Sequence, residues 1–171
     1  MTIYFADGTS QATAGTAGKV LQVVSSTKTS EYVEDIGGGN YGSDMGLNAS
    51  ITPSSSSNKV LIIISTSQGT SSTTKTGFVV FRAGSVIGYR GDSSGNRTRV
   101  AANDVTNSNN SMVSLSGNYL DSPSSTSSLT YSVRIACPAG HWSYLNRQES
   151  QSNESSQPIA ASTITLMEIA G

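Results

Sequence analysis

The fold class is decided by one alternating stretch, Leu129-Thr130-Tyr131-Ser132-Val133-Arg134-Ile135-Ala136. Large apolar side chains occupy every second position of it, and the positions between them are small or polar. Successive side chains of a β-strand point to opposite faces of the sheet, so this pattern predicts a strand with one buried and one solvated face. Such strands are typical of antiparallel sheets.

Similar stretches on both sides of it predict a protein of about eight to ten short strands. Residues 59–65 hold an aliphatic run and are expected to form a strand buried on both faces. Residues 142–145 follow Gly140 and are expected to form a hairpin with residues 129–136. Further strands are expected at residues 20–24, 31–34, 47–51, 78–82, 86–90, 98–100, 112–120 and 164–169.

No window of the chain keeps the apolar spacing of an amphipathic helix. Short strands separated by long polar loops are typical of two packed sheets. The sequence therefore predicts an all-β protein, a jelly-roll-like antiparallel β-sandwich with an extended N-terminal arm.

The arm is residues 1–18, and the β-sandwich domain is residues 19–171. Ile3, Tyr4 and Phe5 are large and apolar, whereas the rest of the arm is small and polar and has little to bury. Such a segment cannot offset the entropy cost of ordering itself. We expect a partner to order it, by strand addition or by docking of the apolar residues.

The composition excludes several classes of protein. Ser, Thr, Gly and Asn make up 79 of the 171 residues, charged residues are only 12%, and the net charge is −1. A helical protein would be richer in Leu, Glu and Lys, a disordered chain would carry more charge, and a nucleic-acid binder would show a basic excess. Hydrophobic residues are only 35%, so we expect a thin core, explained by the polar arm and by association between chains.

No motif of catalysis or cofactor binding occurs in the sequence. One cysteine, Cys137, and one histidine, His141, cannot make a zinc site. The carboxylates are scattered, so no glycosidase pair is expected, and no nucleophile elbow occurs. Cys137 ends an apolar stretch and is expected to be a buried small side chain. We expect no catalytic residues, no metal and no cofactor.

The densest group of polar and aromatic residues is His141, Trp142, Tyr144 and Arg147. Aromatic side chains on a surface can stack on sugar rings, and arginine can bind carboxylates. The same residues also fit the buried side of a strand, so receptor contact and core packing both stay open. Arg97 and Arg99, in a long polar loop, are candidates for binding an anionic surface.

The sequence predicts no membrane insertion and no secretion signal. The longest aliphatic run, residues 60–64, is far shorter than the roughly 20 residues of a membrane span. Residues 1–8 lack the basic and apolar regions of a signal peptide.

The opening Ile3-x-Phe5-x-Asp7-Gly8-Thr9-x-Gln11-x-Thr13-Ala14 resembles the opening of many fibre and appendage proteins of tailed bacteriophages. Residues 18–24, 51–62, 81–85 and 164–169 are similar to the small β-domains of phages of aquatic bacteria. The resemblance covers nearly the whole chain and depends on the order of these pieces.

The resemblance implies a non-enzymatic structural protein of the virion, assembled in the host cytoplasm and usually a homotrimer. The arm would attach to other virion proteins of the tail or capsid, and the sandwich would face the host, with a surface glycan as a possible receptor. The attachment residues would be Ile3, Tyr4, Phe5, Asp7, Gly8 and Thr9. The receptor contacts would be His141, Trp142, Tyr144 and Arg147.

Long phage fibres carry a shaft, and this sequence has none. A capsid decoration or cement protein with the same fold is therefore the main alternative, and the copy number per virion separates the two. A sugar-binding module and a glycan-degrading enzyme are the remaining alternatives.

Overall fold

The computed structural model describes residues 3–4, 6, 10–11, 17–37, 41–71 and 73–171. Every regular element among them is a strand, as the alternating patterns predicted. The strands are β1 (Ile3–Tyr4), β2 (Ser10–Gln11), β3 (Val20–Lys28), β4 (Tyr32–Ile36), β5 (Asn48–Ile51), β6 (Lys59–Thr70), β7 (Lys75–Arg82), β8 (Ser85–Val86), β9 (Ala102–Val105), β10 (Val113–Asp121), β11 (Leu129–Ala136), β12 (His141–Leu145) and β13 (Ser162–Ile169).

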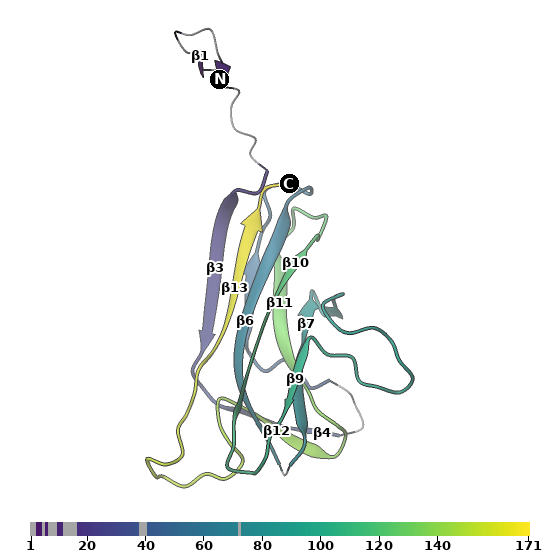
Figure 1. The fold of residues 1–171 in the computed structure, drawn as a ribbon, viewed down its shortest axis with the longest axis vertical. Helices are drawn as coiled ribbons and strands as arrows, with labels where there is room; N and C mark the ends of the chain where they lie inside the picture. Colours follow the sequence, from purple (N-terminus) through teal and green to yellow (C-terminus); the bar gives the residue numbers. More distant parts are fainter. Residues whose placement is uncertain (1–2, 5, 7–9, 12–16, 38–40, 72) are drawn as a thin grey trace.

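Two antiparallel sheets pack face to face (Figure 1). The β6 sheet contains the order β3-β13-β6-β10, and the β7 sheet contains the order β5-β11-β7-β9. When only these eight strands are numbered 1 to 8 along the chain, the β6 sheet has the order 1-8-3-6 and the β7 sheet has the order 2-7-4-5. This is the arrangement of a jelly roll. The predicted jelly-roll-like β-sandwich is confirmed.

The core lies between the inner faces of the two sheets. Alternate residues of β6 and β11 point into it, as the pleat of a strand requires. Fully buried side chains there include Val60, Ile62, Ile64, Tyr131, Val133 and Ile135. The stretch that decided the fold class is therefore β11, with the apolar face inward as predicted.

The expectation that residues 59–65 are buried on both faces is wrong for the single chain. Ile62 and Ile64 are buried on the inner face of β6, but Ile63 on the outer face is 41% exposed. β10 and β13 pair with the two edges of β6. Pairing at the edges leaves the outer face of the strand open.

The expected hairpin between residues 129–136 and 142–145 is also wrong. β12 pairs with β4 and with the end of β6, whereas β11 pairs with β5 and β7 in the other sheet. Pro138 has no N–H to continue the β11 ladder. Gly140, at φ 80°, then turns the chain, and its N–H donates to the Ile36 carbonyl of β4 (3.0 Å). The connection thus crosses from one sheet to the other.

β12 and β13 pair with successive parts of β6, so the sequence between them leaves the sheet and returns to it. Asn146, directly after β12, hydrogen-bonds to β6 and to residues at the far end of the segment that connects β12 to β13. Its N–H donates to the Ser67 carbonyl (2.8 Å), its carbonyl accepts from the Ala160 N–H (2.9 Å), and its side-chain oxygen accepts from Ser162 Oγ (2.6 Å). Its φ of 63° lies in the left-handed region, which asparagine adopts more readily than most residues.

Two further strands differ from the sequence expectation. Residues 98–100 are not a strand, and β9 begins at Ala102 instead. The strand expected at residues 86–90 is only the two-residue β8. The strand expected at residues 112–120 is present as β10.

The core becomes polar toward the end of β6. Gln68 is fully buried, accepts from Thr76 Oγ1 (2.6 Å) and donates to Thr66 Oγ1 (3.1 Å). Thr66 in turn donates to the Leu115 carbonyl (3.3 Å). Buried polar groups are tolerated when they are hydrogen-bonded. This network accounts for part of the low hydrophobic content of the chain.

Glu168 ties together the opposite end of the sandwich, near the start of β3 and the C-terminus. Its side chain is only 1% exposed and accepts hydrogen bonds from Gln22 Nε2 (2.8 Å), Asn58 Nδ2 (2.6 Å), and the N–H (2.6 Å) and Oγ (2.7 Å) of Ser54. Burial alone raises the pKa of this carboxyl, but the donors outweigh it and lower the pKa from 4.5 to about 2. One ionised group thus joins β3, β13 and the turn before β6.

We expect Glu168→Gln to lower the free energy of unfolding by about 2–4 kcal/mol at pH 7, because it removes the charge that four donors share. A carboxyl whose pKa is lowered by folding contributes stability above its unfolded pKa and loses it as the pH falls toward the folded pKa. The difference between wild type and variant should therefore shrink as the pH falls from 4.5 to about 2.

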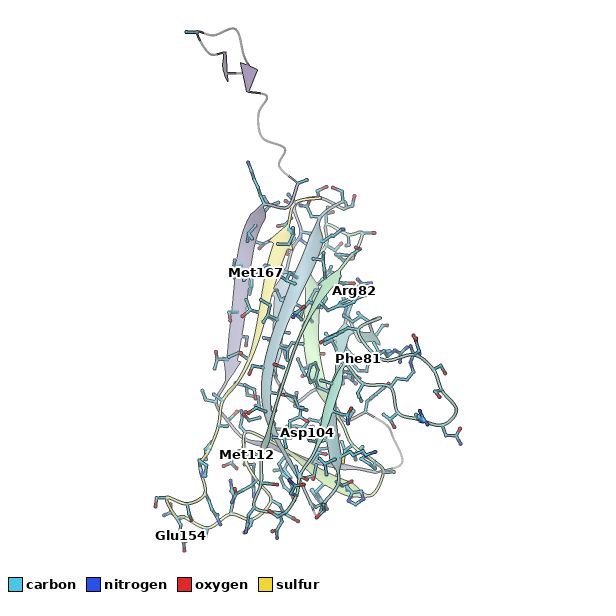
Figure 2. All side chains as sticks on the ribbon, in the orientation of Figure 1. Phe81, Arg82, Asp104, Met112, Glu154 and Met167 are labelled. Atoms are coloured by element: carbon cyan, nitrogen blue, oxygen red, sulfur yellow. The ribbon has the colours of Figure 1, made fainter. Side chains whose placement is uncertain are left out.

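Denaturant unfolding at fixed protein concentration measures this difference. The matched control is Glu154→Gln, because Glu154 is exposed at the tip of a loop (Figure 2). Equal stability of Glu168→Gln and wild type at pH 7 would contradict the assigned role of Glu168.

Candidate functional site

The structure describes part of the arm in which the attachment residues were predicted. Ile3 and Tyr4 form β1, which pairs antiparallel with β2. Phe5, Asp7, Gly8 and Thr9 lie outside the described residues. β1 lies beyond the end of the sandwich at which β3 begins and the chain ends (Figure 1).

A row of apolar side chains crosses the outer face of the β6 sheet. Met167 of β13 lies opposite Val23 of β3 and Leu61 of β6, and Leu61 lies opposite Leu120 of β10. Cross-strand partners share one face of a sheet, so the four side chains form a line across four strands, which we call the apolar row. Met167 stands near its middle, on β13 between β3 and β6 (Figure 2).

Both ends of the apolar row are open to solvent. Val23 is 55% exposed and Leu120 is 45% exposed. At the β-bulge where β3 begins, Val20 and Leu21 add two more exposed apolar side chains. The solvated face of an antiparallel sheet is normally polar. A contiguous exposed apolar area therefore marks an interaction site.

The next two cross-strand rows toward the end of β3 carry no charge, whereas on the other side of the apolar row the exposed Lys59 of β6 lies opposite Ile169. The two uncharged rows are Ser25-Thr165-Ile63-Asn118 and Thr27-Thr163-Ser65-Ser116. Ser25 Oγ and Thr165 Oγ1 hydrogen-bond to each other across the strands (2.9 Å). Without a carboxylate or a cation, these rows offer no acid–base chemistry. They can, however, be covered by another protein without the cost of desolvating a charge.

Three of the four predicted receptor contacts come together on the β4–β12 pair. Trp142 and Tyr144 lie two positions apart on one face of β12, and the Arg147 guanidinium lies 5.2 Å from the centre of the Tyr144 ring. Trp142 is 48% exposed, whereas Tyr144 is buried. His141 points to the other face of the strand. Trp142 thus offers an open ring for stacking, and Tyr144 packs as a core residue.

The buried ionic group of the sandwich is structural. Asp121 accepts hydrogen bonds from Tyr131 Oη (2.7 Å) and Arg82 Nη1 (2.5 Å). Burial, and then the hydrogen bond to Asp121, raise the pKa of the Tyr131 hydroxyl. The tyrosine therefore stays protonated and acts as a fixed donor between β10 and β11.

The described residues contain no group of three His, Cys, Asp or Glu side chains that can hold a metal ion. Cys137 is buried as predicted, and burial raises the pKa of its thiol. A buried protonated thiol is a poor nucleophile. In the described ranges, no helix is long and apolar enough to cross a membrane.

Known proteins give no direct guide to these sites. No protein-family model matches the chain, and no curated protein matches it.

The apolar row was not predicted from the sequence, although one signal of it was present. The run at residues 59–65 is aliphatic on both faces, so it places large apolar side chains on the outer face of the strand as well as in the core. The sequence could not show that this outer face stays open in the single chain. It also could not show that Val23, Met167 and Leu120 fall in register with Leu61, because register is set by long-range pairing.

We expect the fluorescence of Trp142, the single tryptophan of the chain, to be that of a solvated indole. The folded protein should emit at long wavelength and be quenched strongly by acrylamide, since the ring is about half exposed. The unfolded protein in denaturant gives the limit of full access. Short-wavelength emission that resists quenching would place the ring in a core and contradict the exposed position.

Proposed function

We propose that this protein is a non-enzymatic structural protein of a bacteriophage virion, a short homotrimeric fibre or appendage. Residues 1–18 attach it to the particle, and the β-sandwich faces the host or its surroundings. The observation that carries the proposal is the apolar row, a hydrophobic line across the outer face of the β6 sheet whose two ends are about half exposed. The opening sequence motif supplies the link to phage appendages.

A second copy of the same chain is the occupant that suits this face best. The apolar row and the next two rows toward the end of β3 have neither carboxylate nor cation, and Lys59 lies at the border of this area. Identical faces that meet over these three rows therefore bring no like charges together within them. Burying a half-exposed Leu, Ile or Val completely gains about 1 kcal/mol. The exposed aliphatic residues of this face, including Ile63 at 41% exposure, therefore supply several such increments per chain.

Three copies follow from the resemblance to phage fibres, which are usually trimers. The position of the apolar row fits such an assembly. Val23 lies three residues into β3, directly after the arm. Association through this end brings several arms together on one side, where they can hold the particle jointly and gain avidity.

The two ends of the sandwich suit different partners. The arm and the C-terminus lie at one end, and the β4–β12 pair lies at the other (Figure 1). With the arm on the virion, β12, which carries the exposed Trp142, lies at the end away from the particle. We therefore expect a host-surface glycan to bind at that end of the sandwich.

A capsid decoration or cement protein with the same fold remains the second candidate. The observation that favours it is the short distance along the chain between the arm and β3 at Val20, which leaves no room for a shaft. Quantitative mass spectrometry of purified particles separates the two: hundreds of copies indicate decoration, and a small multiple of three indicates a fibre.

Leu120→Asp should convert the trimer into folded monomers. A carboxylate at this end of the apolar row, buried in the proposed subunit contact, costs several kcal/mol unless it is paired. Light scattering during size-exclusion chromatography measures the mass, and circular dichroism checks that the β-sandwich remains folded.

Ile159→Asp is the matched control, because Ile159 is a 63% exposed aliphatic residue in the loop before β13 and lies outside the apolar row. It should keep the mass of the wild type. A Leu120→Asp variant that also keeps the wild-type mass would place the subunit contact elsewhere.

Deleting residues 1–18 should leave a folded domain of unchanged oligomeric state that no longer joins particles. The sandwich keeps its core and its apolar row, and only the attachment segment is lost. Incorporation is measured by complementing a phage that lacks the protein and probing purified particles with an antibody to the sandwich. Incorporation of the truncated protein at wild-type level would contradict the role given to the arm.

A further inference from the structure

A cavity of about 350 Å³ opens beside β7 and β9, away from the apolar row. Its lining includes Lys75 of β7, Asn103 of β9, Arg97 and Thr98 of the preceding loop, and Pro138 after β11. The volume lies at the lower end of the range of ligand pockets in proteins. It is large enough for one sugar ring and its substituents.

The cavity is positively charged. Lys75 and Arg97 both line it, and none of the described carboxylates does. Neither side chain has an ion-pair or hydrogen-bond partner among the described residues. The Asp104 carboxylate, next to Asn103, accepts from the Val105 N–H (2.7 Å) instead, and alternation along β9 directs it to the other face. Two exposed cations are thus left at the cavity without a counter-charge.

The loop that carries Arg97 is held in place by Arg99. Arg99 Nε donates to the Gly91 carbonyl (2.6 Å), and the Arg99 carbonyl accepts from Tyr41 Oη (2.7 Å). A positive patch on a chain of net charge −1 attracts anionic groups selectively.

The remaining walls divide into an apolar and a polar side. Val100, Ala136 and Pro138 supply apolar surface, and Thr98 and Asn103 supply hydroxyl and amide groups. A sugar ring has an apolar C–H surface and a rim of hydroxyl groups, so both kinds of wall have a counterpart on it. A carboxylate or sulfate on the ring would be the partner for Lys75 and Arg97.

We propose that this cavity, which we call the cationic pocket, binds an acidic sugar residue of a surface polysaccharide. The proposal rests on the proposed function, because it gives the outward-facing sandwich a receptor class. A single-stranded nucleic acid is the less suitable ligand, since no aromatic side chain lines the cavity for base stacking.

Isothermal titration calorimetry on the purified full chain tests the proposal. The probes are oligogalacturonate for the carboxylate, carrageenan oligosaccharides for the sulfate, maltooligosaccharides as the neutral control and an oligothymidylate as the nucleic acid. At least one acidic oligosaccharide should bind, and the maltooligosaccharides should not. Binding of the carboxylated or the sulfated probe alone identifies which anion the cationic pocket prefers.

The variants Lys75→Gln and Arg97→Gln should each lower the affinity about tenfold, the effect of losing one charge-assisted hydrogen bond. Both residues are exposed, so the fold should persist, and circular dichroism verifies this. Lys59→Gln is the matched control, because Lys59 is exposed but does not line the cavity.

Three outcomes would overturn the proposal: no binding of either acidic probe, equal binding by the double variant Lys75→Gln/Arg97→Gln, or tighter binding of the oligothymidylate through the same two residues. The assay needs no virion, so it is independent of particle incorporation. Acidic-glycan binding by a protein that never joins particles would overturn the virion assignment and leave the cationic pocket standing.

Discussion

The structure depends on β6, a strand with aliphatic side chains on both of its faces. It pairs with β10 along one edge and with β13 and β12 along the other, so the β6 sheet is assembled around it. Its inner face supplies Ile62 and Ile64 to the core, and its outer face supplies Leu61 and Ile63 to a surface that the described chain leaves open. Single exposed aliphatic side chains are common on protein surfaces, but a contiguous group of them in water is unfavourable and indicates an interaction surface. The proposed association of several chains rests on this open apolar face.

Polar interactions position the parts that surround this strand. Glu168 joins β3, β13 and the turn before β6 through four hydrogen bonds at the end that carries the arm. Asn146 joins β12 to β13 at the far end of the same edge, and the Gln68 network fills the core between β6 and β7. The molecule thus has a hydrogen-bonded end at which β3 begins, an open face on the β6 sheet, and a positively charged cavity lined by Lys75 and Arg97 on the β7 sheet.

The sequence was sufficient for the fold class because β11 alternates between buried and solvated positions, and short strands with polar loops leave few architectures open. It failed where the outcome depends on partners distant in sequence. The strand that pairs with β12 is decided by a crossing at Pro138 and Gly140, not by adjacency along the chain. The exposure of Trp142 and the burial of Tyr144 depend on what packs against β12. The apolar row needs the register of four strands. The cationic pocket could not be predicted because Arg97 and Lys75 lie in separate segments and come together only in the folded chain.

The central claim is that the open face of the β6 sheet is covered by other copies of this chain. The most direct test is the native mass of the unmodified protein, measured by native mass spectrometry over a dilution series. The account predicts a species of three chains, each of 17.7 kDa, that persists at low micromolar concentration. A monomer at all concentrations would contradict it, because the apolar row would then be exposed to water in the working form of the protein.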